Sequence, residues 1–294
     1  MSAYPDDLRQ QVEDYLSAVR FVEREADGVG GLEEAMRYSL LAGGKRIRPV
    51  LALATARAAG ADPARVLPLA AALELIHTYS LIHDDLPAMD DDDLRRGRPT
   101  CHKAFGENVA ILAGDGLYAE AFRHVLTRQQ GDPEAILAAV GELAAATGVN
   151  GMVGGQYLDV TERAPAGAAG LRTIHTLKTG RLIAASVLCP LHLVLVGQPA
   201  RIKLFRDFAS ELGVLFQIVD DILDVTGSDE RLGKPQGSDE RLGKRTYVSE
   251  FGLERARELA AESHRNVRAA LAQAAPAGAT ELEQIADFIV TRTS

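Results

Sequence analysis

Apolar residues recur every three to four positions along nearly the whole chain, whereas the alternation typical of strands is almost absent. Short segments containing glycine and proline interrupt this helical pattern, and none of them is long enough to be an interdomain linker. The sequence therefore predicts an all-α protein, a single domain over residues 1–294 built as a bundle of about ten helices. The predicted helices span residues 5–24, 32–42, 48–59, 64–85, 107–128, 133–149, 169–196, 198–225, 246–274 and 280–292.

Two aspartate-rich clusters interrupt this apolar pattern, at residues 84–90 (DDLPAMD) and 220–224 (DDILD). On a helix, Asp220 and Asp224 share one face and Asp221 lies beside them. Carboxylates this close repel one another and are costly to desolvate, so cations must neutralise them. Mg²⁺ suits this task because it takes carboxylate oxygens and shares its other positions with phosphate and water. A solvated acidic patch is the alternative, and the apolar flanks argue against it.

The helix before the first cluster carries polar groups on one face, because His77, Ser80 and Asp84 are three and four positions apart. A proline turn and four more aspartates follow, and then the run RRGRPT at residues 95–100. Arginine offers fixed paired donors that match the oxygens of a diphosphate. His77 could instead be an ordinary histidine of the core.

Other motifs suit an anion or line the same site. The segment GGKRIRP at residues 43–49 combines a glycine turn with cations at the start of a helix, although a simple helix cap explains it equally well. The segment KTG at residues 178–180 places a glycine inside a helical pattern, where a bend would expose a carbonyl group. Gln217 lies one turn before Asp221, so its amide can face the same cavity.

The octapeptide GSDERLGK occurs twice, at residues 227–234 and 237–244. One interpretation is a local duplication in a solvated loop. The other is that the repeat places Lys234 and Lys244 on a loop just beyond the second aspartate cluster, and both interpretations stay open.

Charge and composition exclude several partners. The net charge of −9 and the pI near 5.3 leave no basic stripe for nucleic acid. Two cysteines support neither a disulfide framework nor a thiolate metal site. The apolar run at residues 182–196 is shorter than the roughly 20 residues that span a bilayer, so no membrane span is expected. The first residues, MSAYPDD, are unlike a secretory or transit peptide, and a cytoplasmic location is expected.

Taken together, the motifs resemble those of the trans-polyprenyl diphosphate synthases. Residues 77–90 and their continuation to residue 102 resemble the family's first aspartate motif, and residues 216–224 (FQIVDDILD) resemble the second. The segments at 43–49, 155–159 (GQYLD) and 178–180 fall in the family's order. The pattern is most similar to bacterial farnesyl diphosphate synthases, which carry two extra residues in the first motif, here Pro87 and Ala88. Val219 departs from the polar Gln of many relatives.

The resemblance implies an isoprenoid-synthase fold around a deep central cavity, a homodimer, and head-to-tail condensation of isopentenyl diphosphate with an allylic diphosphate. It implies three Mg²⁺ ions held by Asp84 and Asp90 on one side and Asp220 on the other, supported by Asp85, Asp221 and Asp224. It further implies that cations neutralise the departing diphosphate, namely Arg95, Lys178, Lys234 and Lys244. The isopentenyl diphosphate site implied by the resemblance comprises Gly44, Lys45, Arg48, His77 and Arg96. The groups expected to face the allylic cation are those of Lys178, Thr179 and Gln217.

Product length is expected to depend on the helix below the first cluster. Ser80 lies about 5.4 Å, one helical turn, below Asp84. Tyr79 beside it is bulky enough to close the floor of the cavity, which predicts a fifteen-carbon product. Tyr79 could instead be ordinary core packing.

Several rival functions remain. A geranylgeranyl diphosphate synthase would have the same site and a deeper cavity. A terpene cyclase would normally carry a different second metal motif, and a non-catalytic regulatory subunit would have lost an aspartate cluster. A calcium-binding or scaffold bundle would leave the basic motifs unexplained.

Overall fold

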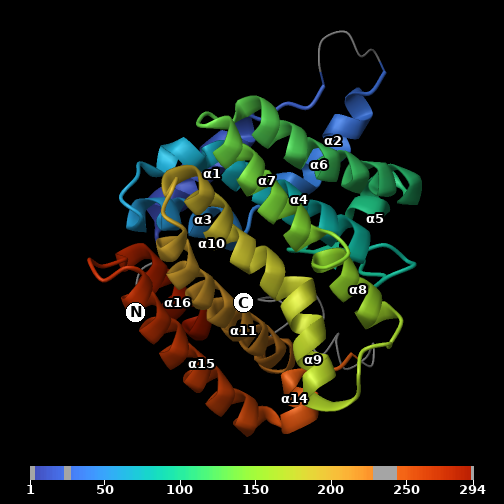
Figure 1. Ribbon diagram of the computed structural model, residues 1–294. Helices are drawn as coiled ribbons and strands as arrows, with labels where there is room; N and C mark the ends of the chain where they lie inside the picture. Colours follow the sequence, from blue (N-terminus) through green and yellow to red (C-terminus); the bar gives the residue numbers. More distant parts are fainter. Residues whose placement is uncertain (1–3, 23–27, 228–243, 293–294) are drawn as a thin grey trace.

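The computed structural model describes residues 4–22, 28–227 and 244–292, and these fold into a helical bundle with one short hairpin (Figure 1). Strands β1 (Leu94–Arg95) and β2 (Arg98–Pro99) pair antiparallel, soon after the first aspartate cluster. The prediction of an all-α fold is confirmed. The helices are α1 (Asp6–Ala18), α2 (Gly30–Leu40), α3 (Ile47–Ala58), η1 (Pro63–Val66), α4 (Leu67–Asp84), α5 (Cys101–Phe105), α6 (Glu107–Arg128), α7 (Pro133–Thr147), α8 (Met152–Val160), α9 (Gly167–His175), η2 (Thr176–Gly180), α10 (Arg181–Val194), α11 (Pro199–Thr226), α14 (Tyr247–Phe251), α15 (Leu253–Ala274) and α16 (Thr280–Thr291).

The predicted helices match the structure best where the apolar pattern is long and uninterrupted. The prediction for residues 107–128 agrees with α6 at both ends, whereas the first helix ends at Ala18 and not at residue 24. No helix was expected where α8 lies. Residues 246–274 divide into α14 and α15 at Gly252, whose φ of +80° is incompatible with a continuous helix. Residues 169–196 likewise divide into α9, η2 and α10, and η2 is a turn of π-helix.

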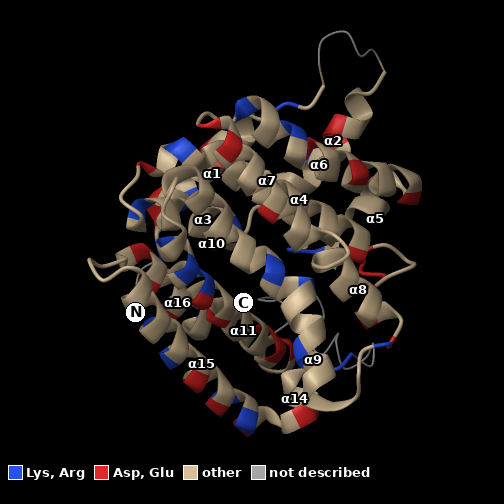
Figure 2. Cartoon of the chain, viewed as in Figure 1, with Lys and Arg blue, Asp and Glu red and all other residues tan. Residues whose placement is uncertain are grey.

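The inner helices of the bundle are α3, α4, α10 and α11. α11 packs on α10 and α15, α4 packs on α3 and α6, and α10 also contacts α3 and α7 (Figure 1). Ten of the twelve residues of α3 are buried, so this helix has no solvent face. α15 instead carries acidic and basic residues along its length (Figure 2), and Glu254, Arg255, Arg257 and Glu258 are exposed. The apolar faces of the inner helices thus enclose the region where the aspartate clusters lie.

Three helical stretches are apolar and long enough to cross a membrane by length and composition alone: Pro63–Asp84, Pro133–Val160 and Gly167–Val194. The sequence prediction considered only the run at residues 182–196. The apolar windows of the three stretches are 67%, 33% and 56% buried among the other helices. The expected lack of a membrane span stays a prediction.

A buried ion-pair network fixes the segment before α3. Arg46, in the left-handed conformation with φ of +53°, donates to Glu74 at 2.7 Å, to Glu13 at 2.8 Å and to the carbonyl of Leu40 at 2.8 Å. The Arg46 and Glu74 side chains are 0% and 2% exposed, whereas Glu13 is 29% exposed. Although burial alone lowers the pKa of Arg46, the two carboxylates raise it above its usual value. The network therefore holds Arg46, and with it the neighbouring Lys45 and Arg48.

We expect Glu74→Ala to lower the free energy of unfolding by about 3–5 kcal/mol, because it leaves a buried guanidinium without its buried partner. Glu13→Ala removes the other carboxylate that pairs with Arg46. Because Glu13 is partly exposed, water already weakens this ion pair, and we expect the free energy of unfolding to fall by about 1 kcal/mol or less. Urea unfolding of the two variants measures the difference. If both variants lost the same free energy of unfolding, the burial of Glu74 would not explain the strength of its ion pair with Arg46.

Candidate active site

A cavity of about 1050 Å³ opens between α3, α4, α8, η2 and α11, and most of the predicted site residues line it. Asp85 and Asp224 do not line it, and both are buried, at 3% and 5% exposure. Lys234 lies outside the residues that the structure describes. The predicted residues on the cavity wall are Gly44, Lys45, Arg48, His77, Tyr79, Ser80, Asp84, Asp90, Arg95, Arg96, Lys178, Thr179, Gln217, Asp220, Asp221 and Lys244.

The first acidic wall comes from the end of α4 and the turn that follows. The Asp90 N–H donates to the Asp84 carbonyl at 2.9 Å, and this bond closes the turn so that both carboxylates reach the cavity. Asp84 accepts a hydrogen bond from the Gln156 amide at 2.8 Å, and both oxygens of Asp90 accept from the Lys244 ammonium at 2.8 Å. Burial raises the pKa of Asp84, and the neighbouring Asp90 raises it further. This wall therefore favours a positive charge.

Asp85 holds Arg95 in place. Their side chains approach to 2.6 Å, and Asp92 contacts the same guanidinium at 3.3 Å. Burial raises the pKa of Asp85 to about 6, even though Arg95 lowers it. Asp84 lines the cavity, whereas the next residue, Asp85, is buried in the protein, where it pairs with Arg95. Asp85 thus positions a cation whose other side lines the cavity.

The second acidic wall is the C-terminal part of α11. Asp220 is 56% exposed and pairs with Arg292 at 3.1 Å. Asp221 is 1% exposed and accepts from the Gln217 amide at 2.7 Å and from the Tyr247 N–H at 2.6 Å. Figure 2 shows acidic residues gathered at this end of α11, with basic residues of neighbouring segments beside them. Asp220 is thus the accessible carboxylate, and Asp221 fixes the groups around it.

The π-helical turn η2 carries Lys178 and Thr179 to the cavity. Lys178 donates to Asp159 of α8 at 2.6 Å. Burial alone lowers the pKa of Lys178, but the carboxylates of Asp84 and Asp159 raise it above its usual value. Glycines let the turn pack this closely, because a Cβ at Gly155 would lie 2.3 Å from the Lys178 nitrogen and one at Gly213 3.0 Å from Gly180 Cα. The sequence prediction of a bend at residues 178–180 agrees with this turn.

A separate basic group lines the other side of the cavity. Lys45 is exposed at the mouth, whereas Arg48 is buried and its Nε atom has no hydrogen-bond partner. Burial lowers the pKa of Arg48 to about 10, so the side chain is still charged at neutral pH. Arg96 donates to the Gly43 carbonyl, and the φ of +121° at Gly44 favours glycine at that position.

His77 lies beside these arginines. Burial lowers its pKa well below the usual value, and Arg48 and Arg96 lower it further, so the imidazole is neutral. A neutral ring among arginines donates one hydrogen bond without adding to their mutual repulsion. The group therefore suits an anion that is bound by arginine, lysine and a neutral imidazole.

Aromatic rings form part of the cavity wall below the first cluster. Tyr79 is 9% exposed, and its ring packs edge-on against Tyr118 at 4.9 Å and His83 at 5.5 Å. Tyr118 packs in turn against Phe122 at 5.2 Å. The Ser80 hydroxyl donates to the His77 carbonyl at 2.9 Å. Tyr79 is thus held by a stack of rings and has little room to rotate.

Sequence reasoning missed two cavity residues that contact the aspartates. Arg292 lies over the Phe216 ring at 4.4 Å and pairs with Asp220, but a lone arginine near residue 294 gives no signal. Gln156 contacts Asp84 and belongs to the segment GQYLD, which was noted only as part of the family pattern. The position of Gln156 in that motif could have indicated that it lies in the cavity.

The residues present fit Mg²⁺. Asp84, Asp90 and Asp220 offer only hard carboxylate oxygens, and all three line one cavity. Burial already disfavours the charged form of Asp84, so a divalent cation there would relieve a real electrostatic cost. The arginines and lysines that line the same cavity can bind an anion that also coordinates the metal.

Residues 30–287 match the family described as Polyprenyl synthetase. The chain is 48% identical over 265 residues to the chloroplastic geranylgeranyl pyrophosphate synthase of Capsicum annuum, covering 89% of this chain and 71% of that protein. It is 47% identical over 257 residues to the farnesyl diphosphate synthase of Geobacillus stearothermophilus, covering 86% and 85%. A geranyltransferase from Helicobacter pylori, solved with magnesium and isoprenyl diphosphate, superposes with a TM-score of 0.83 at 31% identity, covering 97% and 94% of the two chains. The chain therefore has the isoprenoid synthase fold and belongs to the polyprenyl synthetase family of prenyltransferases.

Proposed function

We propose that the protein condenses isopentenyl diphosphate head-to-tail with dimethylallyl or geranyl diphosphate and releases farnesyl diphosphate. The observation that carries the proposal is that one cavity has an acidic side and a separate basic side, each of which can hold one diphosphate. Two diphosphate sites suit a condensation of two substrates. A terpene cyclase would need only one.

The allylic diphosphate is assigned to the acidic side, where Asp84, Asp90 and Asp220 would hold Mg²⁺, three ions by the family resemblance. When bound, the metal stabilises negative charge on the leaving diphosphate. Lys178 and Arg95 add fixed positive charge beside it. Lys244 can add a further positive charge to the diphosphate once its ion pair with Asp90 breaks. Asp85 and Asp221 orient Arg95 and Gln217, while Asp224 lies behind this wall.

Isopentenyl diphosphate is assigned to the basic side, which comprises Gly44, Lys45, Arg48, His77 and Arg96. The carbon–oxygen bond of the allylic substrate breaks, and its electron pair goes to diphosphate. The alkene electrons of isopentenyl diphosphate then form the new carbon–carbon bond. The proton lost from the adjacent carbon goes to the released diphosphate. Polar groups of Thr179 and Gln217 face the intermediate cation, and apolar walls exclude the water that would capture it.

Tyr79 favours a fifteen-carbon product. Its ring lies on the cavity wall and is held by Tyr118 and His83, so a growing chain meets a rigid obstacle. Geranylgeranyl diphosphate synthase is the second candidate, because relatives with that name reach 48% identity to this chain.

Chromatography of the products tests the proposal. With dimethylallyl diphosphate, excess isopentenyl diphosphate and Mg²⁺, we expect farnesyl diphosphate to accumulate, and no condensation when a chelator replaces the metal. A twenty-carbon main product would support the second candidate. A cyclic hydrocarbon, or no product with any allylic starter, would refute the proposal.

Three further expectations are proposals of the same kind. Residues 1–294 form one domain, and the protein works in the cytoplasm. It also forms a homodimer, for which the exposed apolar side chains of Leu112 and Leu126 on α6 offer a contact surface.

A further inference from the structure

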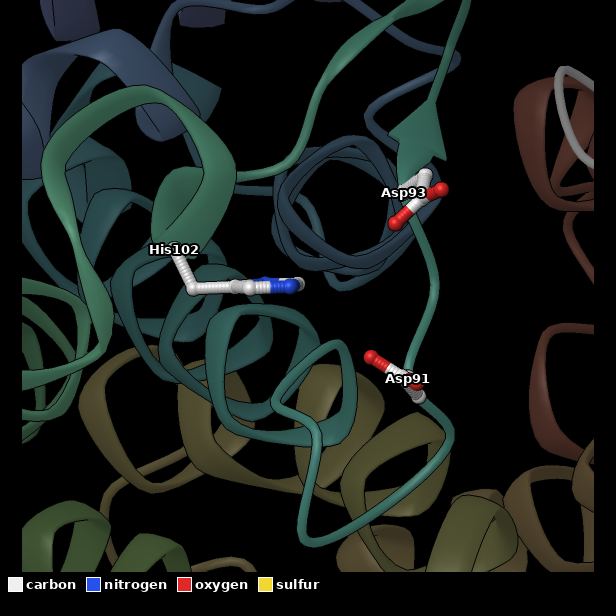
Figure 3. Close-up of side chains that lie close together, drawn as sticks. All are labelled: Asp91, Asp93 and His102. Atoms are coloured by element: carbon white, nitrogen blue, oxygen red, sulfur yellow. The ribbon is translucent and has the colours of Figure 1, made fainter.

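A histidine and two aspartates converge outside the cavity, at the base of the β1–β2 hairpin. Asp91 and Asp93 lie on the segment between the first aspartate cluster and β1, and His102 lies on α5. One ligand atom from each residue lies within 4.8 Å of the other two. Figure 3 shows the imidazole ring pointing toward the space between the two carboxylates. None of the three lines the cavity described above.

The histidine supplies an independent sign of a ligand. His102 is 6% exposed, and its Nε2 atom is buried without a hydrogen-bond partner in the structure. A buried polar atom with no partner is costly, so in a native protein such an atom calls for a water, an ion or another ligand. This atom is on the side of the ring that faces Asp91 and Asp93 (Figure 3).

The other ring nitrogen is already engaged. His102 Nδ1 lies 3.0 Å from the Thr100 hydroxyl, and Thr100 is itself 2% exposed. When Nδ1–H donates to that hydroxyl, the lone pair is on Nε2, which is the form that binds a metal. The Thr100 N–H also donates to the Asp93 carbonyl at 3.0 Å and so ties the aspartate segment to the start of α5. The ring and the backbone of Asp93 are therefore positioned before any ion binds.

We propose that Asp91, Asp93 and His102 form a second divalent-cation site, and that the ion it selects is Zn²⁺ and not Mg²⁺. Imidazole nitrogen is a poor ligand for Mg²⁺, and one nitrogen with two carboxylate oxygens suits zinc and similar transition ions. Ligand atoms around tetrahedral zinc are roughly 3.4 Å apart. The ligand atoms here lie within 4.8 Å of one another, and the exposed side chains of Asp91 and Asp93 can move closer when an ion binds. Water would supply the remaining position.

One side chain competes with the ion. Lys103 Nζ lies 2.7 Å from Asp93 Oδ1, and this contact lowers the pKa of Asp93. Lys103 is 43% exposed, so it can withdraw into solvent when a divalent ion approaches. The lysine therefore weakens the site without blocking it, and removing its charge strengthens binding.

Such an ion would fasten the segment that carries Asp90 and Arg95 to α5. Asp91 follows Asp90 directly, and Asp93 lies two residues before Arg95. A bound ion would restrict the motion of both residues without touching substrate. Its effect would appear first in metal binding and thermal stability.

The test is a Zn²⁺ titration of the full chain in excess Mg²⁺, against a chromophoric chelator that reports free zinc. We expect one Zn²⁺ per chain, retained in the double variant Asp84→Asn/Asp220→Asn, which removes two of the three carboxylates assigned to the metal in the cavity. We expect His102→Gln and Asp91→Asn each to weaken zinc binding at least tenfold, and Lys103→Gln to tighten it severalfold. The exposed Asp91 covers the case in which the buried His102 variant fails to fold.

The outcomes separate this site from the proposed active site. Loss of the zinc in the cavity double variant would place it at the cavity and overturn the inference. Unchanged binding in both Asp91→Asn and Lys103→Gln would overturn it as well, and so would complete displacement of Zn²⁺ by Mg²⁺. In any of these cases His102 would be no more than a hydrogen-bond partner of the Thr100 hydroxyl, and the proposed function would stand.

Discussion

Asp84→Asn and Asp220→Asn should each reduce kcat by about 10³-fold or more, because each removes a carboxylate from the wall assigned to the metal-bound diphosphate. Loss of metal stabilisation of a leaving group is worth several kcal/mol, and three powers of ten correspond to roughly 4 kcal/mol. Since the two carboxylates act on one diphosphate, the double variant should be little slower than either single variant. Steady-state rates at saturating Mg²⁺ measure the effect.

Asp207→Asn is the matched control, because Asp207 is an exposed residue of α11 that does not line the cavity. We expect its rate to stay within twofold of the starting protein. If the Asp220 variant were as fast as this control, α11 would have no part in holding the diphosphate. If the losses of the two single variants multiplied in the double variant, the two walls would act independently.

Tyr79→Ala should shift the main product from fifteen carbons to twenty or more. Removing the ring leaves a hole beside Tyr118 into which a longer chain can extend, and the diphosphate sites stay intact. The rate of the first condensation should change little, since the first product does not reach the ring. Chromatography of dephosphorylated products over a time course reads out the length.

Tyr157→Ala removes a tyrosine of α8 that is 51% exposed and does not line the cavity, so it should leave the product length unchanged. Identical product lengths in the Tyr79 variant and in this control would show that another part of the wall stops the chain. Tyr118→Ala offers an intermediate case, because it loosens the support of Tyr79 without removing the ring.

The fold was predictable where a long apolar repeat marks a helix, and less so where packing overrides local preference. α6 and α11 follow from periodicity, because each carries apolar residues through more than five turns. α8 was missed because Gly154 and Gly155 disrupt its pattern. Gly155 is required by close packing against η2, which no local signal reveals.

The candidate site was predictable as a set of motifs, but not in its contacts. Asp90 pairs with Lys244 across 154 positions and Asp220 with Arg292 across 72, and only the folded chain brings these groups together. Asp85 is buried at the end of α4, where it pairs with Arg95, and the sequence motif alone does not reveal this contact. The sequence therefore predicted most of the aspartates that line the cavity, while their partner cations depended on tertiary structure.

The central claim is that two acidic walls hold the allylic diphosphate through divalent ions, while a metal-free basic group holds the second diphosphate. Calorimetric titration with geranyl diphosphate alone and with isopentenyl diphosphate alone, each with Mg²⁺ and with a chelator, tests it most directly. The account predicts that geranyl diphosphate binds at least 100-fold more weakly without Mg²⁺, while the affinity for isopentenyl diphosphate changes less than threefold. Equal affinity for geranyl diphosphate with and without the metal would contradict it.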